Sequence, residues 1–372
     1  MKIIIAPDSY KGTASAAKAS EAIAAGWASI RPHDDVVLLP MADGGEGTLE
    51  AFARAHPEAH QHDVTVEGPN DVPTQARWLM LPDGTAVVEV ASTSGITLLD
   101  RLRPLTAHTY GLGQAIAHAL DNGARRILVA LGGSSSTDGG AGALTALGAR
   151  FGTDTGEELS RGGGALADLA ALDLAGLRPP PPGGVLVLTD VTNPLLGLAG
   201  AAHVFGPQKG ANAADIQRLE DGLNKLASLL PAHTSAPGSG AAGGTAFGLA
   251  AWGATITAGA PAVGHEIGLP GQVTDADIVI TGEGRYDGQS PAGKVPSYVQ
   301  DVARSAGARC FLIAGAIEEP LTTFAAYASL SAIAGSSQAA MREPLKFLTF
   351  AGAQLALNAE PSVLEESLQP QA

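Results

Sequence analysis

The sequence predicts an α/β protein of two domains, in which mostly parallel sheets are covered by helices. The chain has 372 residues, which exceeds the roughly 250–300 residues at which a single core stops growing. Short, unbroken apolar runs recur along it, as is typical of strands that are buried on both faces. Alanine-rich segments without internal proline, a composition that favours helix, lie between these runs.

Each apolar run is expected to form a strand, and each ends in a polar, glycine-rich loop. The runs cover residues 3–6, 36–39, 127–131, 185–188 and 278–280. The segments expected to form helices cover residues 14–30, 110–120 and 141–147. Alternating strands and helices predict parallel pairing through right-handed crossovers. Because such sheets bind ligands beyond the carboxyl ends of their strands, we expect the five loops to form the site.

The middle of the chain has a different pattern. Between residues 64 and 95, turn signals such as Pro82-Asp83-Gly84 separate short runs rich in β-branched residues, with little helical periodicity. This pattern predicts short strands, some of them antiparallel. This region therefore differs from the purely parallel sheet expected elsewhere.

Composition excludes several classes of function. The formal net charge is −15, with 22 Lys+Arg against 37 Asp+Glu, which argues against nucleic acid and anionic membranes as partners and otherwise favours solubility. The one cysteine, Cys310, lies in an apolar run and is expected to be a buried structural thiol. With no signal peptide pattern and no apolar stretch approaching 18 residues, a cytoplasmic location is expected.

The loop at residues 132–142, called the glycine loop below, is the strongest single indication of function. Backbone N–H groups and hydroxyls there can converge on phosphate oxygens, and the following helix presents its positive end. Asp138 would repel phosphate, so it either holds magnesium or caps the helix. A turn needed only for close packing is the alternative. The candidate phosphate-binding residues are Gly132, Gly133, Ser134, Ser135, Ser136 and Thr137.

The loop after the first strand carries Asp8, Ser9 and Lys11. Lys11 can pair with a phosphate or with a substrate carboxylate, and Asp8 can orient a hydroxyl. Ser9 can bind phosphate, or it can cap the helix that follows. The alternative is therefore that this loop only begins a helix.

The loop after the second strand carries two carboxylates, Asp43 and Glu46, around Gly44 and Gly45. Paired acids suit magnesium or a hydroxyl-rich substrate, and glycine lets a backbone approach a ligand closely. Acids at a helix N-terminus are also ordinary partners of the helix dipole. Both interpretations stay open at this point.

Asp190 and Asn193 follow the strand at residues 185–188. Asp190 can accept a hydroxyl proton, as a kinase base does, or hold magnesium. A carboxylate and an amide that open a turn before proline are the alternative.

The last polar loop carries Glu283, Arg285 and Asp287, and an arginine can grip a carboxylate or phosphate bidentately. Residues 288–294 fit the first seven positions of a P-loop, but Val295 stands where Ser or Thr should bind magnesium. We therefore reject a P-loop and keep Lys294 as a phosphate contact. Lys209 is a weaker candidate of the same kind.

At these loops the sequence resembles the bacterial glycerate kinase family. The segments that carry the resemblance are residues 6–12, 42–48, 132–142, 190–197, 204–211, 243–246 and 281–294. They run in order over nearly the whole chain, which makes the match specific. Tyr10, where the family is expected to prefer phenylalanine, is a conservative departure.

The resemblance implies a Rossmann-like parallel-sheet domain built from both chain ends, residues 1–63 and 276–372. A mixed α/β domain, residues 64–275, is inserted in it, and the active site is expected in the cleft between the two. Substrates would be ATP and D-glycerate, with 2-phosphoglycerate as product in many members and 3-phosphoglycerate in others. Magnesium is expected on some of Asp43, Glu46, Asp138 and Asp190. The oligomeric state, monomer or homodimer, is left open.

Two other functions are alternatives to a kinase. A dinucleotide-dependent dehydrogenase needs G-x-G-x-x-G after a strand, and residues 111–116 lack the third glycine and follow no strand. A non-enzymatic two-domain binder of a small acid would usually carry an export signal. Production of ADP in proportion to added glycerate separates a kinase from both.

Overall fold

The computed structural model describes residues 1–10, 12–287, 294–318 and 321–359. The chain forms two compact units. The terminal unit comprises Met1–Met41 and Leu269–Ala372, and the central unit comprises Ala42–Gly268. These boundaries differ from the expected 63/64 and 275/276, because α2 (Thr48–Ala55) is tied to β5 (Thr85–Glu89) by a hydrogen bond within the central unit.

The terminal unit contains one sheet of five parallel strands, in the order β13-β12-β11-β1-β2. The strands predicted at residues 3–6 and 278–280 do share this sheet, as Ile3 pairs with Ile278, and β12 joins it where Ile280 pairs with Phe311. The strands are β1 (Lys2–Ile5), β2 (Asp35–Leu38), β11 (Ile278–Tyr286), β12 (Arg309–Ile317) and β13 (Ala326–Ser329).

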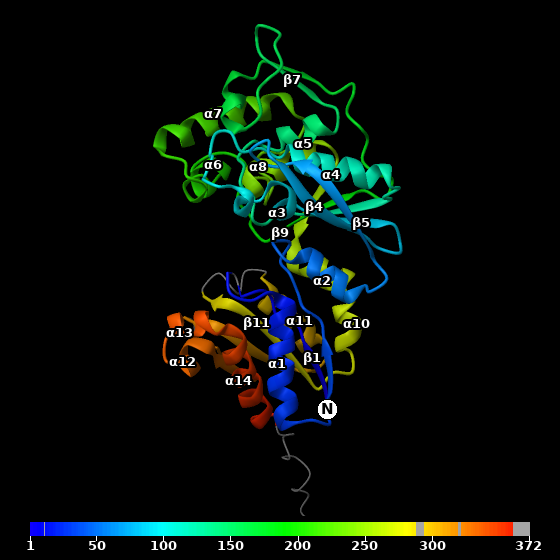
Figure 1. The fold of residues 1–372 in the computed structure, drawn as a ribbon, viewed down its shortest axis with the longest axis vertical. Helices are drawn as coiled ribbons and strands as arrows, with labels where there is room; N and C mark the ends of the chain where they lie inside the picture. Colours follow the sequence, from blue (N-terminus) through cyan, green and yellow to red (C-terminus); the bar gives the residue numbers. More distant parts are fainter. Residues whose placement is uncertain (11, 288–293, 319–320, 360–372) are drawn as a thin grey trace, which may run out of the picture. The chain divides into compact units, whose positions relative to one another are not determined.

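Helices complete this α/β unit (Figure 1). They are α1 (Ala16–Ile30), α10 (Leu269–Val273), α11 (Val295–Ser305), α12 (Leu330–Ala334), α13 (Ser337–Arg342) and α14 (Pro344–Leu357). Helices α1 and α14 lie side by side, where the Arg31 Nε donates to the Ala356 carbonyl at 2.8 Å. Buried Ile23, Trp27 and Leu348 pack there against Ile3 and Ile5 of the sheet.

Strand β11 is longer than the sequence predicted. Residues 281–286 were expected to be a loop, but they continue the strand to Tyr286 because β12 pairs with it over the whole length, out to Ile317. The backbone N–H and C=O groups of residues 281–286 find hydrogen-bond partners on β12, so no turn is needed there. Glu283 and Arg285 therefore project from a strand, one buried and the other exposed.

The central unit has a mixed sheet in the order β10-β9-β6-β5-β4-β3. The strands from β5 to β10 pair in parallel, whereas β3, β4 and β5 pair antiparallel. This confirms the antiparallel strands expected near residues 64–95. The strands are β3 (His60–Glu67), β4 (Pro73–Met80), β5 (Thr85–Glu89), β6 (Arg126–Ala130), β9 (Val185–Thr189) and β10 (Thr255–Ala258), with β7 (Arg150–Gly152) and β8 (Ala171–Asp173) as a separate pair.

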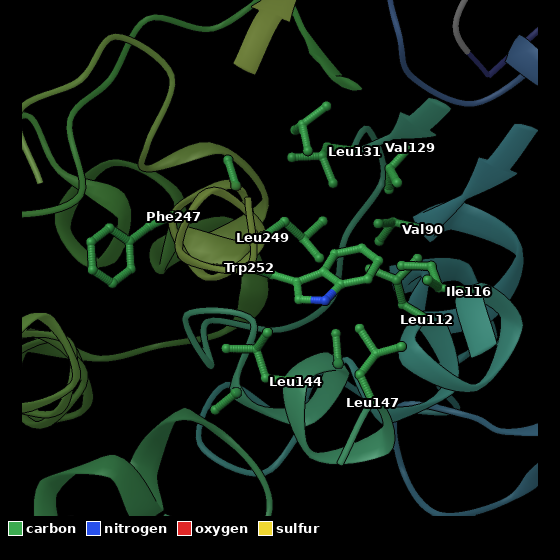
Figure 2. Packing of buried hydrophobic residues seen from close by; sticks show 14 of the residues in the cluster. Val90, Leu112, Ile116, Val129, Leu131, Leu144, Leu147, Phe247, Leu249 and Trp252 are labelled. Atoms are coloured by element: carbon green, nitrogen blue, oxygen red, sulfur yellow. The ribbon is translucent and has the colours of Figure 1, made fainter. Parts of the chain in front are cut away.

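The helices of the central unit enclose a large apolar core. Figure 2 shows Trp252 surrounded by Leu112, Leu144, Leu147 and Leu249. The helices are α2, α3 (Val90–Ser94), α4 (Tyr110–Asp121), α5 (Ala141–Ala146), α6 (Ala201–Phe205), α7 (Ala213–Leu229), α8 (Ala241–Ala251) and α9 (Gly259–Glu266), with short 3₁₀ turns at Ile96–Leu98, Gly163–Asp168 and Pro207–Lys209. The helices predicted at residues 14–30, 110–120 and 141–147 correspond to α1, α4 and α5. Across the described ranges, no helix has the length and apolar character needed to cross a membrane.

Candidate active site

The glycine loop follows β6 and is held on two sides by backbone hydrogen bonds. On one side, the Ser135 amide and hydroxyl both donate to the Ser94 carbonyl, at 3.1 and 2.8 Å. On the other, the Gly132 amide donates to the Gly44 carbonyl at 3.1 Å. The loop is therefore fixed before any ligand arrives.

Asp138 anchors the far end of the glycine loop. Its carboxylate is 1% exposed and accepts hydrogen bonds from the Thr109 amide and hydroxyl, both at 2.8 Å. The amides of Gly140 and Gly142 donate to it at 3.2 Å each. These bonds match the alternative in which Asp138 caps the following segment, and they occupy both carboxylate oxygens.

Several donors of the glycine loop have no partner in the part of the chain that the structure describes. The Thr137 hydroxyl is buried and makes no hydrogen bond, and the Thr137 and Asp138 amides meet no acceptor there. Buried donors are rarely left unpaired in folded proteins, so their presence indicates a ligand that accepts hydrogen bonds. Helix α5 is only six residues long, so these loop donors rather than a helix dipole would bind an anion.

The loop with Asp43 lies directly against the glycine loop. A Cβ on Gly132 would come within 2.3 Å of the Gly45 Cα, and one on Gly44 within 2.8 Å of the Leu188 carbonyl. Glycine is required at both positions because only a bare backbone allows this approach. The packing brings Gly44, Gly45 and Gly132 together, and it places the loop at the end of β9, which leads to Asp190.

The four predicted acidic ligands differ in their surroundings. Asp43 is buried and its Oδ1 accepts the Gly45 amide at 2.8 Å, whereas Glu46 is exposed and Asp190 is partly exposed. In the described residues, no group of three or more His, Cys, Asp or Glu side chains could hold a metal ion. The geometry therefore offers single carboxylates rather than a closed metal cage.

Glu89, which is not among the predicted site residues, is a further buried carboxylate of this region. It ends β5, is 7% exposed, and accepts the Leu49 amide at 2.7 Å. Burial raises its pKa to about 7, against the lowering effect of the Leu49 amide and of Arg77. Gly47, the residue before α2, has no side chain to cap the helix, and the Glu89 carboxylate accepts an amide of its first turn instead. Its position at the end of an apolar run is the signal that could have identified it.

Lys209 is buried, unlike its neighbours Gln208 and Gly210, which are both exposed. Its ammonium donates to the Ser136 carbonyl in the glycine loop. Burial lowers its pKa to about 8, and the charge of Asp138 works in the opposite direction. Lys209, the weaker candidate for a phosphate contact, therefore contacts the backbone of the glycine loop.

In the terminal unit, Asp8 follows the carboxyl end of β1, and Glu283 lies within the adjacent strand β11. The Asp8 amide donates to the Gly282 carbonyl at 2.8 Å, and both carboxylates are buried. Burial and then these two acids raise the pKa of Tyr10 well above its ordinary value. The Tyr10 hydroxyl donates a hydrogen bond to the Ile313 carbonyl at 2.8 Å, which phenylalanine at this position could not do.

The other charged candidates of the terminal unit are more exposed. Arg285 is 63% exposed and its Nη1 lies 3.3 Å from Glu318. The Lys294 Nζ lies 3.9 Å from the Asp287 carboxylate, so these two predicted residues do come together. Lys11 lies outside the described residues.

The two remaining candidates make local contacts. The Ser9 amide donates to the Asp8 carboxylate at 2.6 Å. Asn193 donates through Nδ2 to the Ala199 carbonyl at 2.8 Å, and its own carbonyl accepts the Gly240 amide at 2.9 Å. These contacts stabilise a turn, which is the alternative role considered for Asn193.

Comparison with known proteins identifies relatives along nearly the whole chain. Residues 3–359 match the model of the glycerate kinase family. A glycerate 2-kinase of Escherichia coli K12 is 42% identical over 329 residues, which cover 86% of each chain. A glycerate kinase of Bacillus subtilis 168 is 42% identical over 85% of each chain. A crystal structure assigned as glycerate kinase 2 from Salmonella typhimurium LT2 has a TM-score of 0.83 and 37% identity, covering 96% of this chain and 98% of that one.

Proposed function

Because the chain belongs to the glycerate kinase family, we propose that it transfers the γ-phosphoryl group of ATP to a hydroxyl of D-glycerate, with 2-phosphoglycerate as the product. The 2-position follows the name of the Escherichia coli relative. The related alternative is the 3-position, which would give 3-phosphoglycerate. Both products arise from the same phosphoryl transfer.

The observation that supports this function best is the set of unpaired donors in the glycine loop. The Thr137 hydroxyl and the Thr137 and Asp138 amides lack acceptors in the described residues, and a chain of phosphate groups supplies acceptors. Phosphoryl transfer depends on such positioning and on neutralisation of charge rather than on covalent catalysis. The hydrogen bonds of Asp138 and Ser135 hold these donors in place without the ligand.

We assign the other roles by chemistry. Lys11, Arg285 and Lys294 would neutralise the carboxylate of glycerate or the migrating phosphoryl group. Asp190 or Asp8 would accept the proton of the attacking hydroxyl, which leaves its oxygen free to attack the γ-phosphorus.

Magnesium fits this donor set in the manner usual for kinases. Mg²⁺ keeps several waters and binds one or two carboxylates together with substrate phosphates, so a cage of three side chains is not required. Asp43 and Asp190 would hold it, because the Asp43 loop packs on β9 just before Asp190. Asp138 is the poorest candidate, since both its oxygens already accept hydrogen bonds. When bound, magnesium neutralises charge on the nucleotide phosphates.

A coupled assay for ADP tests the activity, with D-glycerate as acceptor and magnesium added or removed by EDTA. We expect ADP in proportion to added glycerate, and loss of turnover with EDTA. A rate of ADP formation that is independent of glycerate would contradict the proposal. NMR of the phosphorylated product then distinguishes phosphate at carbon 2 from phosphate at carbon 3.

A further inference from the structure

Lys209 occupies an unusual position for a lysine. Its side chain is 2% exposed, although it follows the exposed Gln208 at the end of the turn Pro207–Lys209. Burying an ammonium costs several kcal/mol unless it is paired and hydrogen-bonded. In the described part of the chain it has one acceptor, the Ser136 carbonyl, and no carboxylate within 4.0 Å. A side chain kept in this state at a cost to stability indicates a function.

The contact with Ser136 fixes the peptide group between Ser136 and Thr137. In a planar trans peptide the C=O and N–H bonds point in opposite directions. Because the Ser136 carbonyl points to Lys209, the Thr137 N–H points away from Lys209. That amide is one of the donors that meet no acceptor in the described residues.

The surroundings leave this peptide little freedom to turn. A Cβ on Gly243 would come within 2.1 Å of the Ser136 carbonyl oxygen, and one on Gly163 within 2.2 Å of the Thr137 carbonyl oxygen. Gly243 has a φ of 66° inside α8, a conformation that glycine adopts without strain. Lys209 therefore holds the loop together with two close backbone contacts.

We infer that Lys209 is a positioning residue for polyphosphate binding. Its hydrogen bond keeps the Thr137 amide directed at the anion, and its buried positive charge attracts the anion from beneath the loop. This inference rests on the proposed function, since it assigns the glycine loop to the phosphates of ATP. A direct contact with phosphate would not explain why Lys209 is buried, because its ammonium donates to a backbone carbonyl instead. A positioning role does explain it.

The test measures binding of inorganic triphosphate, with excess magnesium chloride, by calorimetry. Lys209→Met keeps the apolar stem and removes the charge, and Lys209→Arg restores the charge. Lys225→Met is the matched control, since Lys225 is exposed and also donates to a backbone carbonyl, that of Ala167. We expect at least a tenfold weaker Kd for Lys209→Met, a Kd within about threefold of wild type for Lys209→Arg, and no change for Lys225→Met.

Steady-state kinetics and thermal unfolding separate a positioning role from a merely structural one. We expect the KM for ATP to rise in Lys209→Met while the KM for glycerate stays within twofold, and the melting temperature not to fall. A folded Lys209→Met that binds triphosphate as wild type does would overturn the inference. If that variant does not fold, the neutral Lys209→Gln takes its place, with the same expected loss and the same contradicting result. Wild-type protein that binds neither triphosphate nor ATP would instead defeat the proposed function.

Discussion

The glycine loop of the central unit and the charged strand ends of the terminal unit are built differently. In the glycine loop, Asp138 and Ser135 are almost fully buried and bonded to the protein. In the terminal unit, Arg285 is 63% exposed and its ion pair with Glu318 joins two exposed side chains. The polar groups of the glycine loop hold a backbone in place, whereas the Arg285–Glu318 pair presents charged groups to solvent.

This difference separates two ways of contributing to phosphoryl transfer. Prearranged backbone donors bind an anion without reorganisation, which is favourable when charge must be stabilised. Exposed arginine and lysine side chains supply charge, and they add little to folding because water screens their pairs. Substitutions in the glycine loop should therefore change stability and activity together, whereas those at the exposed charges should change activity alone.

Asp138→Ala should have the largest effect. It removes the acceptor of four buried hydrogen bonds, and leaving such donors unpaired around a lost buried charge costs about 3–5 kcal/mol. Urea unfolding should show that decrease, and turnover should fall with it. Asp154→Ala, at an exposed carboxylate of the same unit, should unfold as wild type does. An unchanged urea midpoint for Asp138→Ala would remove its anchoring role.

Lys11→Ala should lower activity. If Lys11 contacts the transition state, turnover should fall at least about a hundredfold, which corresponds to about 2.7 kcal/mol. Lys18→Ala, at an exposed lysine of α1, is the control and should keep the wild-type rate. A near-normal rate in a folded Lys11→Ala protein would exclude Lys11 from the mechanism.

Much of the fold was predictable because local pattern and tertiary environment agree. The apolar runs at residues 3–6, 127–131 and 185–188 became β1, β6 and β9, since each is buried on both faces. The full length of β11 was not predictable. Its polar end, with Glu283 and Arg285, is strand only because β12 pairs with it, and that pairing joins distant parts of the chain.

The site was predictable in its loops and less so in its buried charges. Glycine and hydroxyl residues after a strand indicate a phosphate loop by composition alone. Burial of Lys209 cannot be seen in sequence, because Gln208 and Gly210 beside it are exposed. Whether Asp138 caps or binds metal depends on Thr109, which lies on a different segment and reaches the carboxylate only in the folded chain.

Glu89→Gln tests how burial of a carboxylate in the central unit changes stability with pH. Because burial raises the Glu89 pKa from 4.5 to about 7, the folded state keeps a proton that the unfolded state has already released. The free energy of unfolding should therefore fall as pH rises from about 4.5 to about 7, and stay lowered above that. Relative to Glu89→Gln, wild type should lose about 2 kcal/mol between pH 5 and pH 8. Parallel stability curves for the two proteins would contradict this, and Glu157→Gln, at an exposed carboxylate, should follow wild type.

Arg285→Ala should give the smallest change and the clearest separation of stability from activity. Its ion pair joins side chains that are 63% and 52% exposed, so the free energy of unfolding should change by less than about 0.5 kcal/mol. If the guanidinium grips the glycerate carboxylate or the phosphoryl group, kcat/KM should still fall about tenfold, because a charge-assisted hydrogen bond of about 1.4 kcal/mol is lost. Arg304→Ala removes another exposed ion pair of the same unit, with Asp301, and should leave both quantities unchanged. Equal kinetics for the two variants would place Arg285 outside the site, and the terminal unit would then depend on Lys11 and Lys294 for positive charge.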